Sequence, residues 1–158
     1  MKLTKQLLNI CIKKNVTIST AESCTGGALS ALLTSEPGAS KIFTHGFVVY
    51  SNLAKIKILS VSQKTLEQYG AVSEQVAQEM AYNCRKISGS KIGISITGIA
   101  GPGSSDSKPE GRVCFGLSTK NLLTTETIDF KAIGRIKVRE RSVDHCIKVL
   151  FTQLLSEV

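Results

Sequence analysis

The alternation of apolar and polar residues along the chain predicts a succession of helices and strands. Apolar side chains recur every three or four residues in several segments, which indicates amphipathic helices. We expect these helices at residues 3–14, 28–33, 53–59, 64–69, 74–87 and 135–155. Short runs of β-branched and other apolar residues, bounded by Gly, Pro, Ser or Asn, indicate strands. These runs are residues 16–20, 42–50, 92–97, 113–119 and 124–130.

The order of these segments predicts the fold class. Strands and helices alternate through most of the chain, which is typical of a sheet covered by helices on both faces. The last two strand runs are joined through Lys120 and Asn121, a connection that predicts a β-hairpin and therefore antiparallel strands. We expect an α/β fold, built as a single three-layer α/β/α domain with a mixed sheet over residues 1–158.

The composition agrees with one self-sufficient domain. The chain has 158 residues, 42% of them hydrophobic, so it can bury a core without metal or disulfide cross-links. Its five cysteines are widely spaced, which predicts neither a disulfide framework nor a zinc site. Residues 1–14 lack a signal-peptide core, and no apolar run approaches the length of a membrane span. We expect a cytoplasmic protein without a membrane partner.

The charge balance favours anionic partners. A net charge of +8 and a pI near 9.4 suit either phosphorylated small molecules or nucleic acid. Only 5% of the residues are aromatic and none is tryptophan, which weakens the second choice. The densest basic stretch, residues 131–141, has the pattern of a solvated helix face. We therefore expect a small-molecule ligand and no specific binding of nucleic acid.

The first candidate site is the turn of hydroxyls and glycines at residues 21–27, which joins a predicted strand to a predicted helix. The free N–H groups and the dipole of the helix would favour an anion or a developing oxyanion there. Gly26 and Gly27 would let a ligand approach the backbone closely. Alternatively, Ser23 or Thr25 only caps the helix, and the turn by itself leaves both interpretations open.

A second candidate turn, residues 98–103, is rich in glycine and follows the strand run 92–97. Ligands in open α/β sheets gather at the carboxyl ends of strands, so we expect the two turns to share one edge of the sheet. Tyr50 and Lys55, at the end of the middle strand run, would complete one pocket. Residues 104–110 are polar and are predicted to form a mobile surface loop, where function is often found.

The titratable residues favour serine and lysine chemistry. His45 and His145 are the only histidines and the aspartates are scattered, so we expect no metal ion, no other cofactor and no His-based triad. A lysine that is buried or close to another cation loses its proton more readily and can act as a base toward a serine. Lys55 is the candidate base. Its alternative is an ordinary solvated lysine.

Cys24 is a rival nucleophile, because a thiol at a helix N-terminus has a lowered pKa. The alternative for Cys24 is a small core residue, which is the usual fate of a free cysteine. The corresponding alternative for Tyr50 is an aromatic side chain half-buried on a strand.

Five motifs, in order along most of the chain, resemble the CinA C-terminal domain family. They are Thr-Ala-Glu-Ser-Cys-Thr-Gly-Gly (20–27), Pro-Gly-Ala-Ser (37–40), Tyr-Ser-Asn with Ala-Lys (50–55), Gly-Ala-Val-Ser-Glu (70–74) and Thr-Gly-Ile-Ala-Gly-Pro-Gly (97–103). That family includes an amidase that hydrolyses the carboxamide of nicotinamide mononucleotide to nicotinic acid mononucleotide and ammonia. Some members carry a further N-terminal domain, which we expect to be absent here.

The resemblance implies a catalytic group consisting of Ser23, Lys55, Tyr50 and Ser40. Ser23 and Ser40 both lie in family motifs, and either could be the nucleophile. Ser23 is favoured by its place at the strand-to-helix turn, with Ser40 as an orienting or oxyanion group. The resemblance also implies a set of substrate-binding residues and a homo-oligomer. These residues are Glu22, Thr25, Gly26, Gly27, Asn52, Thr97, Gly98, Gly101 and Arg135, with Arg135 pairing with the phosphate.

The chain departs from the family pattern at two places. The family's Gly-Asp-Arg before the last helix is Ile133-Gly134-Arg135 here, and its Gly-Pro-Gly-Gly loop ends in Ser104. The segment from Lys108 to Gly111 keeps the family's Lys-Pro-x-Gly shape. Two other functions remain open: a non-catalytic protein associated with competence or DNA damage, and a nucleotide-binding module that keeps the pocket without turnover.

Overall fold

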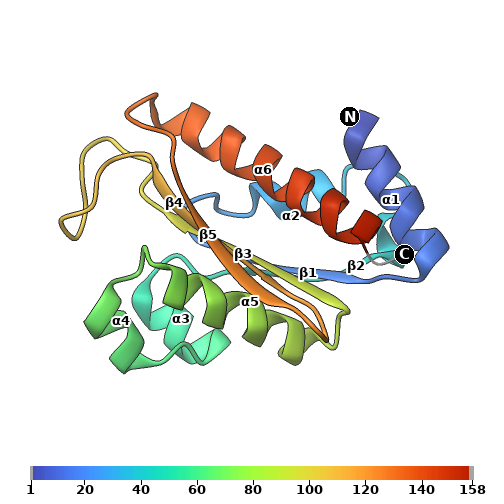
Figure 1. The fold of residues 1–158 in the computed structure, drawn as a ribbon, viewed down its shortest axis with the longest axis horizontal. Coiled ribbons are helices and arrows are strands. Elements are labelled where there is room, and N and C mark those ends of the chain that lie inside the picture. Colours follow the sequence, from blue (N-terminus) through green and yellow to red (C-terminus); the bar gives the residue numbers. More distant parts are fainter. Residues whose placement is uncertain (1, 157–158) are drawn as a thin grey trace.

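The computed structural model describes residues 2–156 and contains a five-stranded sheet between two layers of helices (Figure 1). Of the predicted domain 1–158, residues 1, 157 and 158 lie outside this description. The helices are α1 (Lys2–Lys14), α2 (Ala28–Leu33), α3 (Asn52–Leu59), α4 (Gln63–Tyr69), α5 (Glu74–Ser88) and α6 (Arg135–Ser156), with a short 3₁₀ turn η1 (Ala39–Lys41). The strands are β1 (Ile18–Glu22), β2 (Phe43–Val48), β3 (Ile92–Gly98), β4 (Arg112–Ser118) and β5 (Leu123–Asp129).

The sheet has the strand order β2-β1-β3-β4-β5. Strands β2 and β3 run parallel to β1 on either side of it, whereas β4 runs antiparallel to β3 and β5 antiparallel to β4. The predicted mixed sheet and its hairpin are therefore confirmed. The three parallel strands end at the same edge of the sheet, which is where the candidate turns begin.

The first strand is displaced from its predicted position. The sequence pattern places it at residues 16–20, whereas β1 pairs with β3 from Ile18 through Glu22. The displacement arises because the backbone N–H of Val16 donates to the carbonyl of Cys11 at 2.8 Å and so closes the end of α1. Glu22 therefore belongs to the strand, and the candidate turn starts at Ser23.

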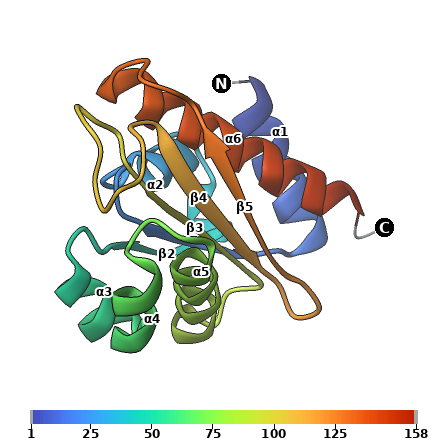
Figure 2. The same cartoon turned by 60° about the vertical axis from the view of Figure 1, so that its left-hand side comes forward.

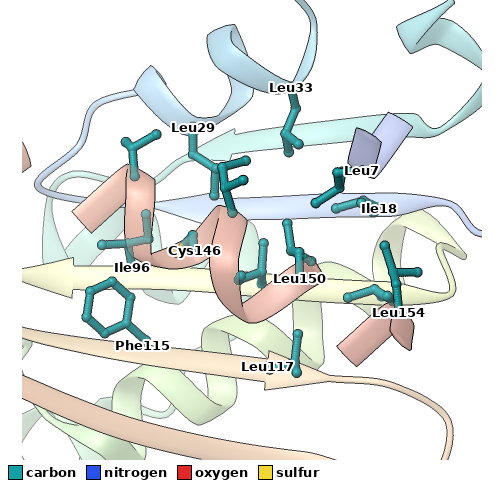
Figure 3. Close-up of a cluster of buried hydrophobic side chains, with 14 of the residues drawn as sticks. Leu7, Ile18, Leu29, Leu33, Ile96, Phe115, Leu117, Cys146, Leu150 and Leu154 are labelled. Carbon is teal, nitrogen blue, oxygen red and sulfur yellow. The ribbon is translucent and has the colours of Figure 1, made fainter. Parts of the chain in front are cut away.

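Helices α1, α2 and α6 cover one face of the sheet, and α3, α4 and α5 cover the other (Figures 1 and 2). The larger core lies under α6, where apolar side chains from both helical and strand elements meet (Figure 3). Those labelled there are Leu7, Ile18, Leu29, Leu33, Ile96, Phe115, Leu117, Cys146, Leu150 and Leu154. Because β3 has helices on both faces, nearly all of it is buried.

Helix α5 packs directly onto glycines of the sheet. A Cβ atom at Gly93 would lie 2.3 Å from the carbonyl oxygen of Ala81, and one at Gly116 would lie 2.4 Å from that of Ala77. The hydroxyl of Ser95, which pairs with Gly116 across β3 and β4, donates to the same Ala77 carbonyl at 2.6 Å. Small residues on β3 and β4 thus bring the helix close to the strands.

Hydroxyl caps start the helices on this side of the sheet. The side chains of Ser51, Ser62 and Ser73 each accept a hydrogen bond from a backbone N–H in the first turn of α3, α4 and α5. The longest helix, α6, has 22 residues. Within residues 2–156, no helix combines the length and the apolar character needed to span a membrane.

Candidate active site

A pocket of about 250 Å³ opens at the carboxyl ends of the parallel strands. Ser23 follows β1, Tyr50 follows β2, and Thr97 and Gly98 end β3, so the three strands converge on it as the sequence predicts. The backbone N–H of Ser23 donates to the carbonyl of Ile96 at 2.9 Å and holds the first turn beside β3. Loop residues and Arg135 complete the lining. The full set is Ser23, Cys24, Tyr50, Lys55, Ala71, Val72, residues 97–106 and Arg135.

Lys55 is buried at the base of this pocket with 1% of its surface exposed, which excludes the alternative of a solvated lysine. Its position on the first turn of α3, after the Ser51 cap, directs the side chain inward. The ammonium nitrogen donates to Ser23 Oγ at 2.9 Å and to the carbonyls of Val49 at 2.9 Å and Tyr50 at 3.1 Å. All three ammonium N–H groups therefore have an acceptor.

Burial lowers the pKa of Lys55 from 10.5 to about 8, although the nearby Cys24 raises it slightly. Among residues 2–156, no carboxylate lies within ion-pair distance of the amine. A useful fraction of Lys55 is thus neutral near pH 8. A neutral amine keeps two N–H groups for the Val49 and Tyr50 carbonyls, and its lone pair then faces Ser23 Oγ.

Ser23 has the geometry of an activated nucleophile. Its hydroxyl lies within hydrogen-bond distance of the Lys55 amine and also donates to the Tyr50 carbonyl at 3.4 Å. The side chain is 8% exposed and borders the pocket. A serine within reach of a base that loses its proton near neutral pH can attack a carbonyl carbon.

Cys24 borders the same pocket but belongs to the large core cluster. Burial raises the pKa of its thiol to about 12, so the thiolate is scarce at neutral pH. Of its two sequence interpretations, the buried core residue is the one that fits the structure.

Glu22 closes the turn between β1 and α2. Its carboxylate is completely buried and accepts hydrogen bonds from the backbone N–H groups of Gly27 (3.1 Å), Leu29 (3.0 Å) and Ser30 (2.8 Å). It also accepts from the Ser30 hydroxyl at 2.6 Å. Of the two interpretations left open for this turn, the cap by Ser23 or Thr25 is absent, since Gly27 is the N-cap of α2 and no hydroxyl caps the helix. The N–H groups expected to bind an anion are occupied by a carboxylate of the protein, and Glu22 does not reach the pocket.

The rest of the glycine turn faces α6 instead of the pocket. Gly26 and Gly27 adopt φ values of 60° and 97°, a left-handed conformation that residues other than glycine rarely adopt. Arg139 of α6 donates to the carbonyl of Thr25 at 3.0 Å. Thr25, Gly26 and Gly27 do not border this pocket, and their contact with a ligand stays a prediction.

Two further expected residues lie elsewhere. Ser40 is exposed on η1, before the amino end of β2, while Tyr50 follows the carboxyl end of the same strand. The length of β2 therefore separates Ser40 from the pocket, and the structure corrects its grouping with Ser23. Asn52 is exposed at the start of α3 and borders hollows next to α4.

Arg135 spans the pocket opening from the first residue of α6. Its guanidinium donates to the carbonyl of Gly101 at 2.8 Å and to the hydroxyl of Tyr50 at 3.0 Å. Tyr50 is 57% exposed, so it is not the half-buried strand aromatic that the sequence offered as its alternative interpretation. Thr97, Gly98 and Gly101 also border the pocket, as expected.

Sequence reasoning missed a wall of the pocket. Ala71 and Val72, between α4 and α5, face the loop that carries Ser104, Ser105 and Asp106. The family motif at residues 70–74 was the available signal for Ala71 and Val72, but the sequence alone assigned that motif no role. Within the described part of the chain, no three His, Cys, Asp or Glu side chains are grouped closely enough to hold a metal ion.

Comparison with known proteins gives a consistent result. The model of the CinA C-terminal domain matches residues 1–154. The chain is 44% identical over 153 residues to the CinA-like protein of Chlorobium phaeobacteroides, covering 94% of this chain and 36% of that protein. The chain thus spans about a third of the length of the curated relatives it matches.

Solved structures share the whole fold. Competence/damage inducible protein CihA from Agrobacterium tumefaciens has a TM-score of 0.92 at 35% identity, over 96% of this chain and 93% of that one. A competence or damage-inducible protein from Enterobacter asburiae has a TM-score of 0.93 at 38% identity, over 97% and 96%.

Glu22→Gln should destabilise the fold, because an amide places N–H groups against the N–H groups of α2 and removes the charge that they bind. We expect the free energy of unfolding to fall by about 2–4 kcal/mol, measured by urea denaturation. Glu140→Gln, at an exposed site on α6, is the matched control and should change it by less than about 0.5 kcal/mol. Equal stability of the two variants would contradict the capping role.

Lys55→Met should make the fold more stable at pH 7. The native pKa of about 8 lies below the unfolded value of 10.5, so the charged amine is disfavoured in the native state. The shift corresponds to at most about 3 kcal/mol. Between pH 8 and 10.5 the unfolded chain binds more protons than the native protein, so wild-type stability rises with pH. The difference in the free energy of unfolding between Lys55→Met and wild type should therefore narrow. Urea denaturation at pH 7 and 10 tests this, with the exposed Lys57→Met as control; a gap that widened with pH would refute it.

Proposed function

Because the chain belongs to the CinA C-terminal domain family, we propose that it hydrolyses the carboxamide of nicotinamide mononucleotide with Ser23 as nucleophile. The observation that carries this proposal is the 2.9 Å hydrogen bond between the buried Lys55 amine and Ser23 Oγ at the base of the pocket. The lowered pKa of Lys55 supports its role as the base. The products are nicotinic acid mononucleotide and ammonia.

The reaction has two stages. Ser23 Oγ attacks the carboxamide carbon while neutral Lys55 takes the hydroxyl proton. The ammonium of Lys55 then gives this proton to the amide nitrogen, the C–N bond breaks, and ammonia leaves an ester on Ser23. In the second stage Lys55 deprotonates a water that attacks the ester, and the same proton returns to Ser23 Oγ. The pyridinium ring withdraws electrons from the carboxamide and assists both attacks.

Tyr50 and Arg135 bind the substrate in this proposal. The Tyr50 hydroxyl accepts a hydrogen bond from Arg135, so its own proton is available to an acceptor in the pocket. Arg135 has N–H groups beyond the two that contact Gly101 and Tyr50, and its charge stands at the pocket opening, where it suits a phosphate. The arginine of the family's Gly-Asp-Arg segment is kept here.

Lys55→Arg should abolish most of the activity, because a guanidinium keeps the charge but does not deprotonate in this range. We expect kcat for ammonia release from nicotinamide mononucleotide to fall about 100- to 10,000-fold, with Ser23→Ala at least as severe. Lys57→Arg, at an exposed site on the same helix, is the control that should keep kcat. A folded Lys55→Arg protein with normal kcat would place the base elsewhere.

Activity should depend on pH through Lys55. Since the base must be neutral and its pKa is about 8, kcat/KM should rise about tenfold per pH unit below that value and level off above about pH 9. Initial rates of ammonia release across pH 6 to 10 measure the profile. A profile that is flat between pH 6 and 9, or that falls, would exclude Lys55 as the general base.

A further inference from the structure

Lys108 connects two parts of the pocket wall that are distant in sequence. It is half-buried in the loop between β3 and β4, and its ammonium donates to the backbone carbonyls of Tyr69 and, at 2.5 Å, Val72. These two carbonyls lie at the junction between α4 and α5. Figure 2 shows this loop extending toward that junction.

The junction suits a lysine for two reasons. Tyr69 is the last residue of α4, where carbonyl groups lack partners within the helix and the dipole favours a cation. Gly70, next along the chain, leaves room for the ammonium, because a Cβ atom there would lie 3.2 Å from Lys108 Nζ. Gly70 also has a φ of 76°, which other residues rarely adopt.

The loop around Lys108 is tied together internally. The backbone groups of Ser105 and Lys108 exchange two hydrogen bonds, at 2.9 and 3.1 Å. The carboxylate of Glu110 accepts from the N–H of Gly103 at 2.7 Å. Residues 103–110 therefore form a small hairpin-like unit, and Lys108 attaches it to α4 and α5.

Both ends of this attachment carry residues that border the pocket. On the loop side these are Ser104, Ser105 and Asp106, and on the junction side Ala71 and Val72. The junction is held from beneath as well, since the Thr97 hydroxyl donates to the Ala71 carbonyl at 2.7 Å. The distance between the two walls thus depends on the Lys108 attachment, although Lys108 itself does not border the pocket.

We propose that Lys108 is a positioning residue that holds the loop 103–110 against the α4–α5 junction and so sets the width of the substrate pocket. This proposal rests on the proposed amidase function for its kinetic consequence. Lys108 takes no part in the chemistry of Ser23 and Lys55, because its ammonium contacts the Tyr69 and Val72 carbonyls and does not border the pocket. Its loss should therefore weaken substrate binding and leave the bond-making steps intact.

The test compares Lys108→Met with Lys108→Arg, which can still donate to both carbonyls, and with Lys120→Met, an exposed control on the β4–β5 hairpin. Losing the attachment should raise KM for nicotinamide mononucleotide about tenfold while kcat stays within about twofold. Lys108→Arg should recover most of the wild-type KM, and the control should match wild type. An unchanged KM, or a fall in kcat as large as the rise in KM, would overturn the proposal.

Amide hydrogen exchange gives a readout that does not depend on activity. Exchange at residues 103–108 should speed up in Lys108→Met and not in Lys120→Met, because the loop loses its attachment. Unchanged exchange overturns the proposal whether or not the enzyme is active. If wild type releases no ammonia from nicotinamide mononucleotide, the proposed function fails, and faster exchange would still support the attachment.

Discussion

The buried carboxylate of Glu22 is the interaction on which the pocket end of the molecule depends. A buried charge is tolerated only when it is fully hydrogen-bonded, and this one accepts from three backbone N–H groups and one hydroxyl at the start of α2. The last residue of β1 is thereby bound to the first turn of the next helix. Ser23 sits inside that closed turn, so its backbone is held where its hydroxyl meets Lys55. The same contacts fill the helix end that would otherwise attract a phosphate.

Lys55 imposes the opposite kind of constraint. Its amine is buried without a carboxylate partner among the described residues. Backbone carbonyls accept its hydrogen bonds but do not neutralise its charge. Such a site disfavours the charged form and lowers the stability of the native state at neutral pH. It also supplies a neutral amine beside a serine. In the proposed enzyme, function and stability therefore make opposing demands on this side chain.

Local signals predicted most of the fold, whereas the site required knowledge of the topology. The caps at Ser51 and Ser73 and the β4–β5 hairpin depend on neighbouring residues, and they were predictable. The grouping of Ser23 with Lys55 followed from the rule that ligands gather at the carboxyl ends of strands. Ser40, like Ser23, lies in a family motif. A motif does not show at which end of β2 its residues lie.

The role of Glu22 was unpredictable for a related reason. Its partners lie five to eight residues further along the chain, and a glutamate before a glycine turn also fits a ligand contact. The sequence shows that a polar side chain is present. Only the path of the backbone shows whether that side chain points into the pocket or toward other backbone groups. The same ambiguity applied to Thr25 and the glycines after it.

The bridge made by Arg135 has a consequence for product release. Its guanidinium donates to two groups of the protein itself, the Gly101 carbonyl and the Tyr50 hydroxyl. In the proposed enzyme, a phosphate must share this group with the protein or displace those contacts. The net affinity is then a difference between two sets of hydrogen bonds, and the protein acts as an internal competitor. In that enzyme, a bond that re-forms as the ligand departs would shorten the residence time of a charged product and let the pocket empty between turnovers.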